Sequence, residues 1–310
     1  MSFDIEKISF QLGENRIPVE EICKNTGRDY RRLVSKSGFE YVHRTDLSEQ
    51  DFFSKFLNLE LNLKAEDYLI FVNQGLNSLI PGKISSLFKD TPNFDSTLFL
   101  EVSDGCTGFV RALILANTII LSKTALRVHI VCGEKYSAYY MDSDTSVSPI
   151  FSDAISLTTI VPGTTHTLVA SSVNNFFEKS DAISTYTDSS ARLQLKMDGS
   201  IVLSWATNSV PTNLDALFLK SSITKTDIDT WLFHQGSKIM IEMLADRLEI
   251  DNDGLFVAGQ IGNATSSSIP IALSKVLLEK DLSQSQSRNV VMVGFGVGLS
   301  IVSILVRINL

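Results

Sequence analysis

The sequence TLFLEVSDGCTGFVRALILANTII, residues 97–120, begins with a short apolar run and ends in a longer run rich in Ala, Leu and Ile. Between the two runs lies Ser-Asp-Gly-Cys-Thr-Gly, whose glycines permit a tight turn. The pattern predicts a strand, a corner at Cys106 and an apolar helix. Residues 255–278, LFVAGQIGNATSSSIPIALSKVLL, have the same order, and Asn263 stands at the equivalent corner.

Two further pairs of segments repeat at the same spacing. Residues 66–88 and 227–248 each combine an acidic lead-in, an apolar strand, a Gln-Gly corner and a helical pattern. Residues 128–134 and 290–296 match as closing strands that end in glycine or next to it. The offset is roughly 160 residues throughout, so the chain is predicted to contain two similar halves.

The two halves, which we place at residues 1–160 and 161–310, should each alternate strands with helices and form a mostly parallel sheet. Ligands bind at the carboxyl edge of such sheets, so residues at the corners should become neighbours in space. These residues are Gln74, Cys106, His234, Asn263 and the glycine-rich turn at residues 294–298.

Composition and charge exclude several classes of protein. The 310 residues are 44% hydrophobic and 20% charged, which excludes a disordered chain. A formal net charge of -8 argues against nucleic acid and against an anionic membrane surface as the main partner. Three widely spaced cysteines form neither a disulfide framework nor a metal motif, and we expect a reducing compartment and no metal.

Two segments bear on export and on membrane insertion. Residues 1–18 mix acids and bases where a signal peptide needs a continuous apolar stretch, so we expect a cytoplasmic protein. Residues 290–306, VVMVGFGVGLSIVSILV, carry no charge and have nearly the length of a transmembrane helix. Their β-branched residues and three glycines favour two buried strands joined by a turn.

Cys106 is a candidate nucleophile because of its place in the pattern. A thiol at a helix N-terminus faces unpaired N–H groups, so we expect a lowered pKa and a reactive thiolate. The alternative is a small buried apolar side chain, which is the commoner role of a cysteine. The flanking glycines favour the nucleophile, because packing does not require them. Cys23 and Cys132 lack this setting, and we assign both to packing.

His234 and Asn263 stand at two further corners of the repeat. Each has a structural alternative: a hydrogen bond at a helix N-terminus for His234, and an N-cap for Asn263. Together with Cys106 they provide one nucleophile and two neutral donors that could stabilise an oxyanion or an enolate. Such a set suits attack on a thioester, followed by carbon–carbon bond formation with an enolate generated by decarboxylation.

At these residues the chain resembles the β-ketoacyl-acyl-carrier-protein synthase III family of the thiolase superfamily, over nearly its whole length. The motifs are GCTGF around Cys106, WLFHQG around His234, GNATSSSIPIAL around Asn263 and GFGVGLS at residues 294–300. The resemblance implies a thiolase fold, in which duplicated α/β halves form a five-layered α/β/α/β/α sandwich, and it implies a homodimer.

The same resemblance implies the roles of individual residues. Cys106, His234 and Asn263 would form the catalytic triad, and the N–H groups of Cys106 and Val297 the oxyanion hole. The substrates would be acyl-coenzyme A or an acyl-carrier protein, together with malonyl-carrier protein, and no further cofactor is implied. The implied substrate-binding positions are Arg32, Lys36, Ile80, Gln235, Phe295, Gly296 and Gly298.

Three of those positions depart from the family's usual residues. Arg32 stands where a tryptophan often stacks on the adenine of coenzyme A, Lys36 stands where an arginine is usual, and Ile80 replaces a pocket phenylalanine.

Two other functions stay open from the sequence. An acyltransferase would pass the acyl group of Cys106 to oxygen or nitrogen without decarboxylation. A catalytically silent subunit would pair with an active homologue, although it would have no need of the complete Cys, His and Asn set. Carbon dioxide release distinguishes condensation from plain transfer.

Overall fold

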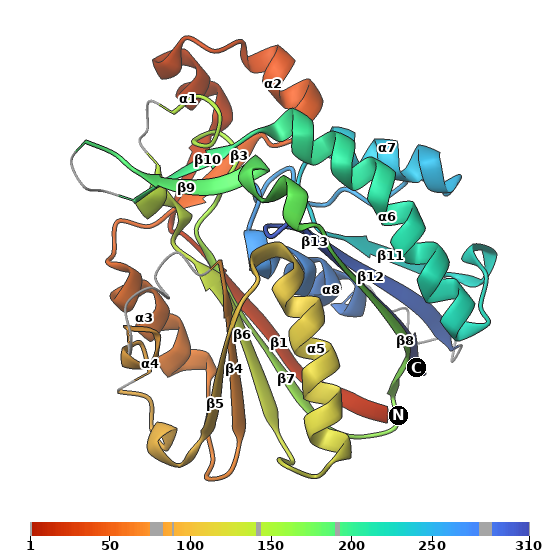
Figure 1. Cartoon of the computed structure of the whole chain (residues 1–310). Helices are drawn as coiled ribbons and strands as arrows, with labels where there is room; N and C mark the ends of the chain where they lie inside the picture. Colours follow the sequence, from red (N-terminus) through yellow and green to blue (C-terminus); the bar gives the residue numbers. More distant parts are fainter. Residues whose placement is uncertain are drawn as a thin grey trace.

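The chain folds around one large sheet with helices on both of its faces, as the computed structural model shows (Figure 1). The structure describes residues 2–74, 83–88, 90–140, 144–189, 193–278 and 287–309. The large sheet has the strand order β11-β12-β13-β8-β1-β7-β6-β4-β5. Its strands are β1 (Ser2–Leu12), β4 (Tyr68–Asn73), β5 (Leu98–Ser103), β6 (Val128–Glu134), β7 (Ala154–Pro162), β8 (His166–Asn175), β11 (Thr230–Phe233), β12 (Arg288–Gly296) and β13 (Ser300–Ile308).

The described residues also form helices and two small two-stranded sheets. The helices are α1 (Val19–Thr26), α2 (Tyr30–Ser37), α3 (Glu49–Glu60), α4 (Lys83–Ser86), α5 (Gly105–Leu121), α6 (Gly199–Ser221), α7 (Lys238–Leu248) and α8 (Ser268–Leu278). The small sheets pair β2 (Asn15–Pro18) with β3 (Tyr41–Arg44), and β9 (Ile183–Thr187) with β10 (Leu193–Met197).

The strand pairing confirms that the chain is duplicated. In the first half β4 runs parallel to β6, and the pairs β6–β7 and β7–β1 are antiparallel. In the second half β11 runs parallel to β12, and the pairs β12–β13 and β13–β8 are antiparallel. Residues 163–165 connect β7 to β8, and the first residues of β1 pair with β8. This pairing joins the two half-sheets into one.

Apolar side chains on alternate faces of the strands divide the molecule into five layers. One core lies between α3 and the sheet of the first half. A second encloses α5 and α8 between the two half-sheets, and a third lies between the second half-sheet and the pair α6 and α7. On β12, Val290 and Met292 face the central helices while Val291 and Val293 face the outer ones, as the period of a strand requires. The layered thiolase fold is thereby confirmed.

One predicted element does not form. The strand expected at residues 255–261 is a series of turns, so β11 has no partner on its outer side within the described residues. Val257 explains the loss, because its backbone groups bond to side chains: its N–H donates to Gln235 Oε1, and its carbonyl accepts from Lys275 Nζ. Gly254 and Gly262 add left-handed turns with φ of +72° and +81°. In a strand, the N–H and C=O of such a residue would form hydrogen bonds with the neighbouring strand, so here they are not available for that pairing.

The apolar stretch at residues 290–306 forms strands, as expected. It lies in β12 and β13, which pair with each other around the glycine turn. Within the described residues, the structure contains no helix with the length and apolar character needed to cross a bilayer. The packing roles of Cys23 and Cys132 are confirmed, since both are buried in apolar clusters.

Candidate active site

The cysteine corner, residues 103–108, carries Cys106 from the end of β5 into the second position of α5. Gly105 has φ +43°, and a Cβ there would lie 2.2 Å from Oε1 of Gln74. Only glycine meets both demands. Cys106 is 7% exposed, and Gln74 lies beside it as the repeat predicted.

A polar network ties this corner to the second half of the chain. The carboxylate of Asp104 accepts from Arg111 Nε, and Arg111 also donates to Asn175 Oδ1 over 3.0 Å. The hydroxyls of Thr107 and Ser300 lie 3.1 Å apart. The network therefore fixes the start of α5 against β8 and β13.

The end of β12 packs directly on Cys106. A Cβ at Gly294 would lie 2.8 Å from the carbonyl oxygen of Cys106, and a Cβ at Gly296 would lie 2.9 Å from its Cβ and 3.1 Å from its Sγ. Side chains at either position would push the cysteine away. The two glycines thus allow the backbone that leads to Val297 to approach the sulfur.

His234 follows β11, and its ring is buried and held from two sides. Its Nδ1 lies 2.7 Å from Ser268 Oγ, and the ring meets Phe295 edge-on with a centroid distance of 5.5 Å. Burial lowers the pKa of His234 to about 3, so the imidazole is neutral. Because Ser268 occupies Nδ1, Nε2 is the nitrogen left for a ligand.

Asn263 is held by its backbone and by half of its amide. Its N–H donates to the carbonyl of Ile150 over 2.9 Å, and its carbonyl accepts from Ser152 N–H over 3.0 Å. Its Oδ1 accepts from Thr265 N–H. The NH₂ group is therefore the part of the side chain that can donate into the cavity.

The run of hydroxyls that follows Asn263 fixes the asparagine corner, residues 261–268. Thr265 Oγ1 and Ser266 Oγ both donate to Oε2 of Glu134, and Ser267 Oγ donates to the carbonyl of Cys132. Glu134 is 4% exposed, and burial raises its pKa to about 7. The corner thus depends on the end of β6.

One cavity of about 600 Å³ brings these groups together. Cys106, His234 and Asn263 line it, as do Phe295, Gly296 and Val297 of the glycine turn, and Arg32 and Lys36 of α2.

Two other predicted positions are absent from the described lining of this cavity. Gln235 is engaged elsewhere, since its amide donates to the carbonyls of Phe233 and Leu255. Gly298 is also outside the lining, and Ile80 lies outside the described residues.

The expected thiolate is a prediction that the structure contradicts. Burial raises the pKa of the Cys106 thiol well above its ordinary value, and the carboxylates of Glu134 and Asp104 raise it further. The helix N-terminus gives at most a partial positive charge, which does not offset the loss of water around a buried anion. The resting site therefore holds a neutral thiol and a neutral imidazole.

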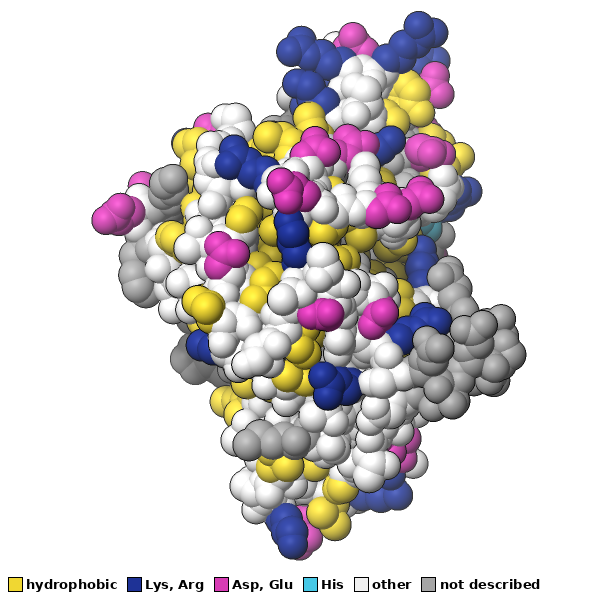
Figure 2. Space-filling view, turned by 90° about the vertical axis from the view of Figure 1, so that its right-hand side faces the viewer, with side chains coloured by type: hydrophobic (Ala, Val, Ile, Leu, Met, Phe, Trp, Pro, Cys, Tyr) yellow, Lys and Arg dark blue, Asp and Glu magenta, His cyan; other side chains and the backbone are white. Residues whose placement is uncertain are grey.

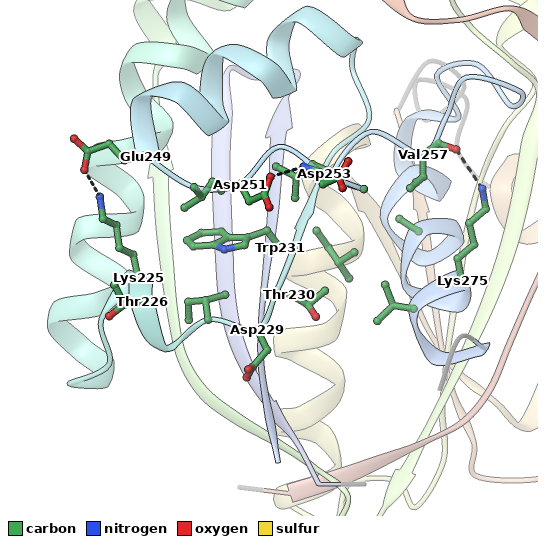
Figure 3. Close-up of a pocket in the computed structure, with 17 residues that line it drawn as sticks. Lys225, Thr226, Asp229, Thr230, Trp231, Glu249, Asp251, Asp253, Val257 and Lys275 are labelled. Atoms are coloured by element: carbon green, nitrogen blue, oxygen red, sulfur yellow. Dashed lines mark hydrogen bonds and ion pairs between the residues drawn. The ribbon is translucent and has the colours of Figure 1, made fainter. Parts of the chain in front are cut away.

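A second cavity, of about 510 Å³, lies beside β11 where the predicted edge strand is missing. Figure 3 shows Trp231 and Thr230 on its wall, with Asp251 and Asp253 on the neighbouring turn. Lys225 is paired with Glu249 (Figure 3). Its described lining contains none of the three corner residues and no cysteine, serine or histidine that could act as a nucleophile or base.

Sequence reasoning missed three residues of the site. Ser268 orients His234, Glu134 holds the asparagine corner, and Tyr136 lines the cavity. The run Thr-Ser-Ser-Ser after Asn263 was a signal for the first two, since so many adjacent hydroxyls need buried partners. Tyr136 gave no signal, because only the fold brings residues 136 and 106 to one cavity.

Two family models match the chain, one in each half of the sequence. The family model described as 3-oxoacyl-[acyl-carrier-protein] synthase III matches residues 100–174, and its C-terminal counterpart matches residues 218–308. The β-ketoacyl-[acyl-carrier-protein] synthase III of Lactococcus lactis is 24% identical, with 96% of each chain covered, and that of Streptococcus pyogenes is 25% identical, with 98% of each covered.

Solved structures show the same fold. The 3-oxoacyl-(acyl carrier protein) synthase III of Pseudomonas aeruginosa superposes with a TM-score of 0.87 at 20% identity, covering 100% of this chain and 99% of the other. The enzyme of Aquifex aeolicus gives 0.83 at 19% identity, covering 99% and 100%. With both family models matched in order and the fold shared from end to end, the chain belongs to the 3-oxoacyl-[acyl-carrier-protein] synthase III family.

Proposed function

We propose that this protein is a condensing enzyme, which takes an acyl group from a thioester onto Cys106 and joins it to malonyl-carrier protein with loss of carbon dioxide. The observation that carries the proposal is the meeting of Cys106, His234 and Asn263 on one cavity. Gly296 supports it, since its missing side chain leaves space beside the sulfur. The names of the relatives point to the same reaction.

In the first half-reaction the sulfur of Cys106 attacks the carbonyl carbon of the thioester. The new C–S bond forms, the bond to the donor's sulfur breaks, and the donor leaves as a thiol. Because the resting thiol is neutral, its proton must move during attack; Nε2 of His234 can accept it and pass it to the leaving sulfur. The N–H groups of Cys106 and Val297 are our candidates for the oxyanion hole.

In the second half-reaction the malonyl group loses carbon dioxide, and its electron pair passes to an enolate. The enolate carbon attacks the acyl carbonyl on Cys106, a C–C bond forms, and the C–S bond breaks. His234 and Asn263 would donate to the enolate oxygen. Ser268 suits both halves, because its hydroxyl can accept from Nδ1 or donate to it, and so supports either tautomer of His234.

The mouth of the cavity supports a phosphate-bearing donor such as coenzyme A or a carrier protein. The charged residues of its described lining all lie between residues 28 and 36: Arg28, Asp29, Arg32 and Lys36. Figure 2 shows Lys and Arg side chains gathered at the top of the molecule, where α1 and α2 lie. Three cations against one anion would attract phosphate despite the net charge of -8.

We also propose a homodimer that forms through β5. Within the described residues β5 pairs only with β4, so its outer edge offers unpaired backbone groups, and Leu98 on it is 47% exposed. An open edge strand is commonly paired or covered. Light scattering should give a mass of twice 34.2 kDa.

Product analysis tests the reaction. With labelled acyl-coenzyme A and malonyl-carrier protein, we expect carbon dioxide release that matches the amount of 3-oxoacyl product. Acyl loading without carbon dioxide release, together with an acylated oxygen or nitrogen acceptor, would establish plain acyl transfer instead. No loading from any thioester would establish a silent subunit.

A further inference from the structure

Tyr136 places a phenol in the wall of the cavity that contains Cys106. It begins the 3₁₀ helix Tyr136–Tyr139, directly after β6 and two residues beyond Glu134. The residue is 1% exposed, and its ring stacks on Phe151 with a centroid distance of 4.5 Å and an interplanar angle of 24°. The stacking fixes the ring, and with it the position of the hydroxyl.

The hydroxyl of Tyr136 has no hydrogen bond to a described residue, unlike its neighbours in the chain. Tyr139 donates to Glu49, and Tyr140 donates to the carbonyl of Phe151. The hydroxyl oxygen is not among the fully buried polar atoms that lack a partner, so it reaches the space of the cavity that Tyr136 lines. The partner for Tyr136 must then come from the content of the cavity.

Tyr136 packs in an apolar cluster with Tyr140, Val147, Phe151 and Leu195. Four residues both line the cavity and pack in this cluster: Ile150, Phe151, Ile183 and Met197. The cations of the described lining, Arg28, Arg32 and Lys36, lie on or next to α2, whereas Tyr136 follows β6. A carboxylate among these apolar side chains would lose its hydration, whereas an uncharged oxygen would find the phenol as a donor.

Burial and the neighbouring Cys106 and Glu134 raise the pKa of Tyr136 well above its ordinary value. The phenol therefore stays protonated and acts as a donor at neutral pH. A donor of fixed position in the wall of this cavity discriminates between acyl chains that can accept a hydrogen bond and those that cannot.

We propose that Tyr136 is a specificity-determining residue, which selects an acyl group with an uncharged oxygen, a hydroxyl or a carbonyl, near the end bound to Cys106. The inference rests on the proposed function, because it concerns the acyl group that Cys106 accepts. A plain alkyl chain would leave the phenol unpaired. When an acyl chain enters the cavity it displaces water from the phenol, and an oxygen on that chain would accept the hydrogen bond in place of the water.

Acyl loading from N-acetylcysteamine thioesters tests this inference, since these donors lack phosphates and differ only in the acyl group. Butanoyl is compared with 2-, 3- and 4-hydroxybutanoyl by intact mass against time. We expect at least one hydroxylated isomer to load about tenfold faster than butanoyl on the wild type. Tyr136→Phe should abolish that preference while it loads butanoyl at least as fast, which also shows that the variant folds. Tyr140→Phe, which removes a hydroxyl outside the cavity lining, should keep the wild-type ratio.

The other outcomes separate the two proposals. If butanoyl loads as fast as every hydroxylated isomer, or if Tyr136→Phe leaves the ratio unchanged, the selectivity is overturned while the condensing function stands; water would then be the partner of the phenol. If none of the thioesters acylates Cys106, the proposed function fails, and the selectivity fails with it.

Discussion

The cysteine corner and the asparagine corner arise from the same repeated pattern but are held in different ways. The first stands between a strand and a helix, β5 and α5, whose backbone bonds place Cys106. The second has lost its strand, and Asn263 is placed by backbone bonds to residues 150 and 152 and by the bonds of Thr265 and Ser266 to Glu134.

The difference teaches that duplication preserves the position of a functional group more closely than the element that carries it. Residues 261–268 take their support from β6 and from residues 150–152, all of which belong to the first half. Two corners of one cavity thus depend on the first half of the chain, one through a strand and a helix and the other through hydrogen bonds of both backbone and side chains. Changes to each corner should therefore have different consequences.

The largest effect is expected at the cysteine corner itself. Cys106→Ala removes the only proposed nucleophile, so acyl loading should disappear and condensation should fall by at least about 10⁴-fold. Intact mass after incubation with acyl-coenzyme A measures the loading. Cys132→Ala, which alters a buried cysteine on β6, is the matched control and should retain the adduct. An adduct that persists in Cys106→Ala would move the nucleophile to another residue.

At the asparagine corner the loss of activity should be smaller, and it should fall mainly on the condensation half-reaction. Asn263→Ala should reduce condensation by about 10²- to 10³-fold while acyl loading falls less than about tenfold, because the amide is proposed to act on the enolate. Single-turnover rates for each half measure the ratio. Asn208→Ala, at an exposed position of α6, should change neither rate. Equal losses in both halves would show that Asn263 supports the cavity rather than the enolate.

Glu134 links the support of the asparagine corner to pH. Because burial raises its folded pKa from 4.5 to about 7, the folded state holds the proton more tightly than the unfolded state. This stabilisation is complete below about pH 4.5 and is lost as the pH rises through 7, with a total on the order of 3 kcal/mol.

Glu134→Gln keeps an acceptor for Thr265 and Ser266 but cannot ionise. The free energy of unfolding of the wild type, relative to this variant, should therefore decrease between pH 5 and pH 8 in denaturant titrations. Glu242→Gln, on an exposed part of α7, should follow the wild type. Parallel curves for the wild type and Glu134→Gln would mean that Glu134 does not titrate in this range.

The smallest effect is expected from a small side chain added next to Cys106, which crowds the cysteine sterically. Gly296→Ala places a Cβ 2.9 Å from that of Cys106, which a shift of a few tenths of an ångström can relieve, so acyl loading should slow by about tenfold. Gly199→Ala alters another glycine of the cavity lining, where a Cβ meets nothing within 4 Å, and should load at the wild-type rate. Equal acyl-loading rates for the two variants would show that the glycine turn can move to accommodate the added Cβ without affecting the reaction.

Local patterns were sufficient for most of the fold. The alternating strands, the apolar helix after Cys106 and the two strands at residues 288–308 follow from periodicity and glycine placement, which act over a few residues. The approach of the corners follows from the repeat, because equivalent strands present their carboxyl ends at one edge. The apolar sequence at residues 255–261 led to a wrong prediction of a strand. The backbone groups of Val257, which a strand would use for its neighbour, bond instead to the side chains of Gln235 and Lys275.

The sequence by itself determined the duplicated α/β pattern and the three corner residues, because both depend on the order of residues along the chain. Only the tertiary structure decided the protonation of the site and the character of its wall. The neutral Cys106 and His234 result from burial, which depends on every layer packed around them. Tyr136 reaches the cavity because β6 ends beside the start of α5, thirty residues away in the chain. Desolvation and convergence belong to the packed chain as a whole, and no local pattern encodes them.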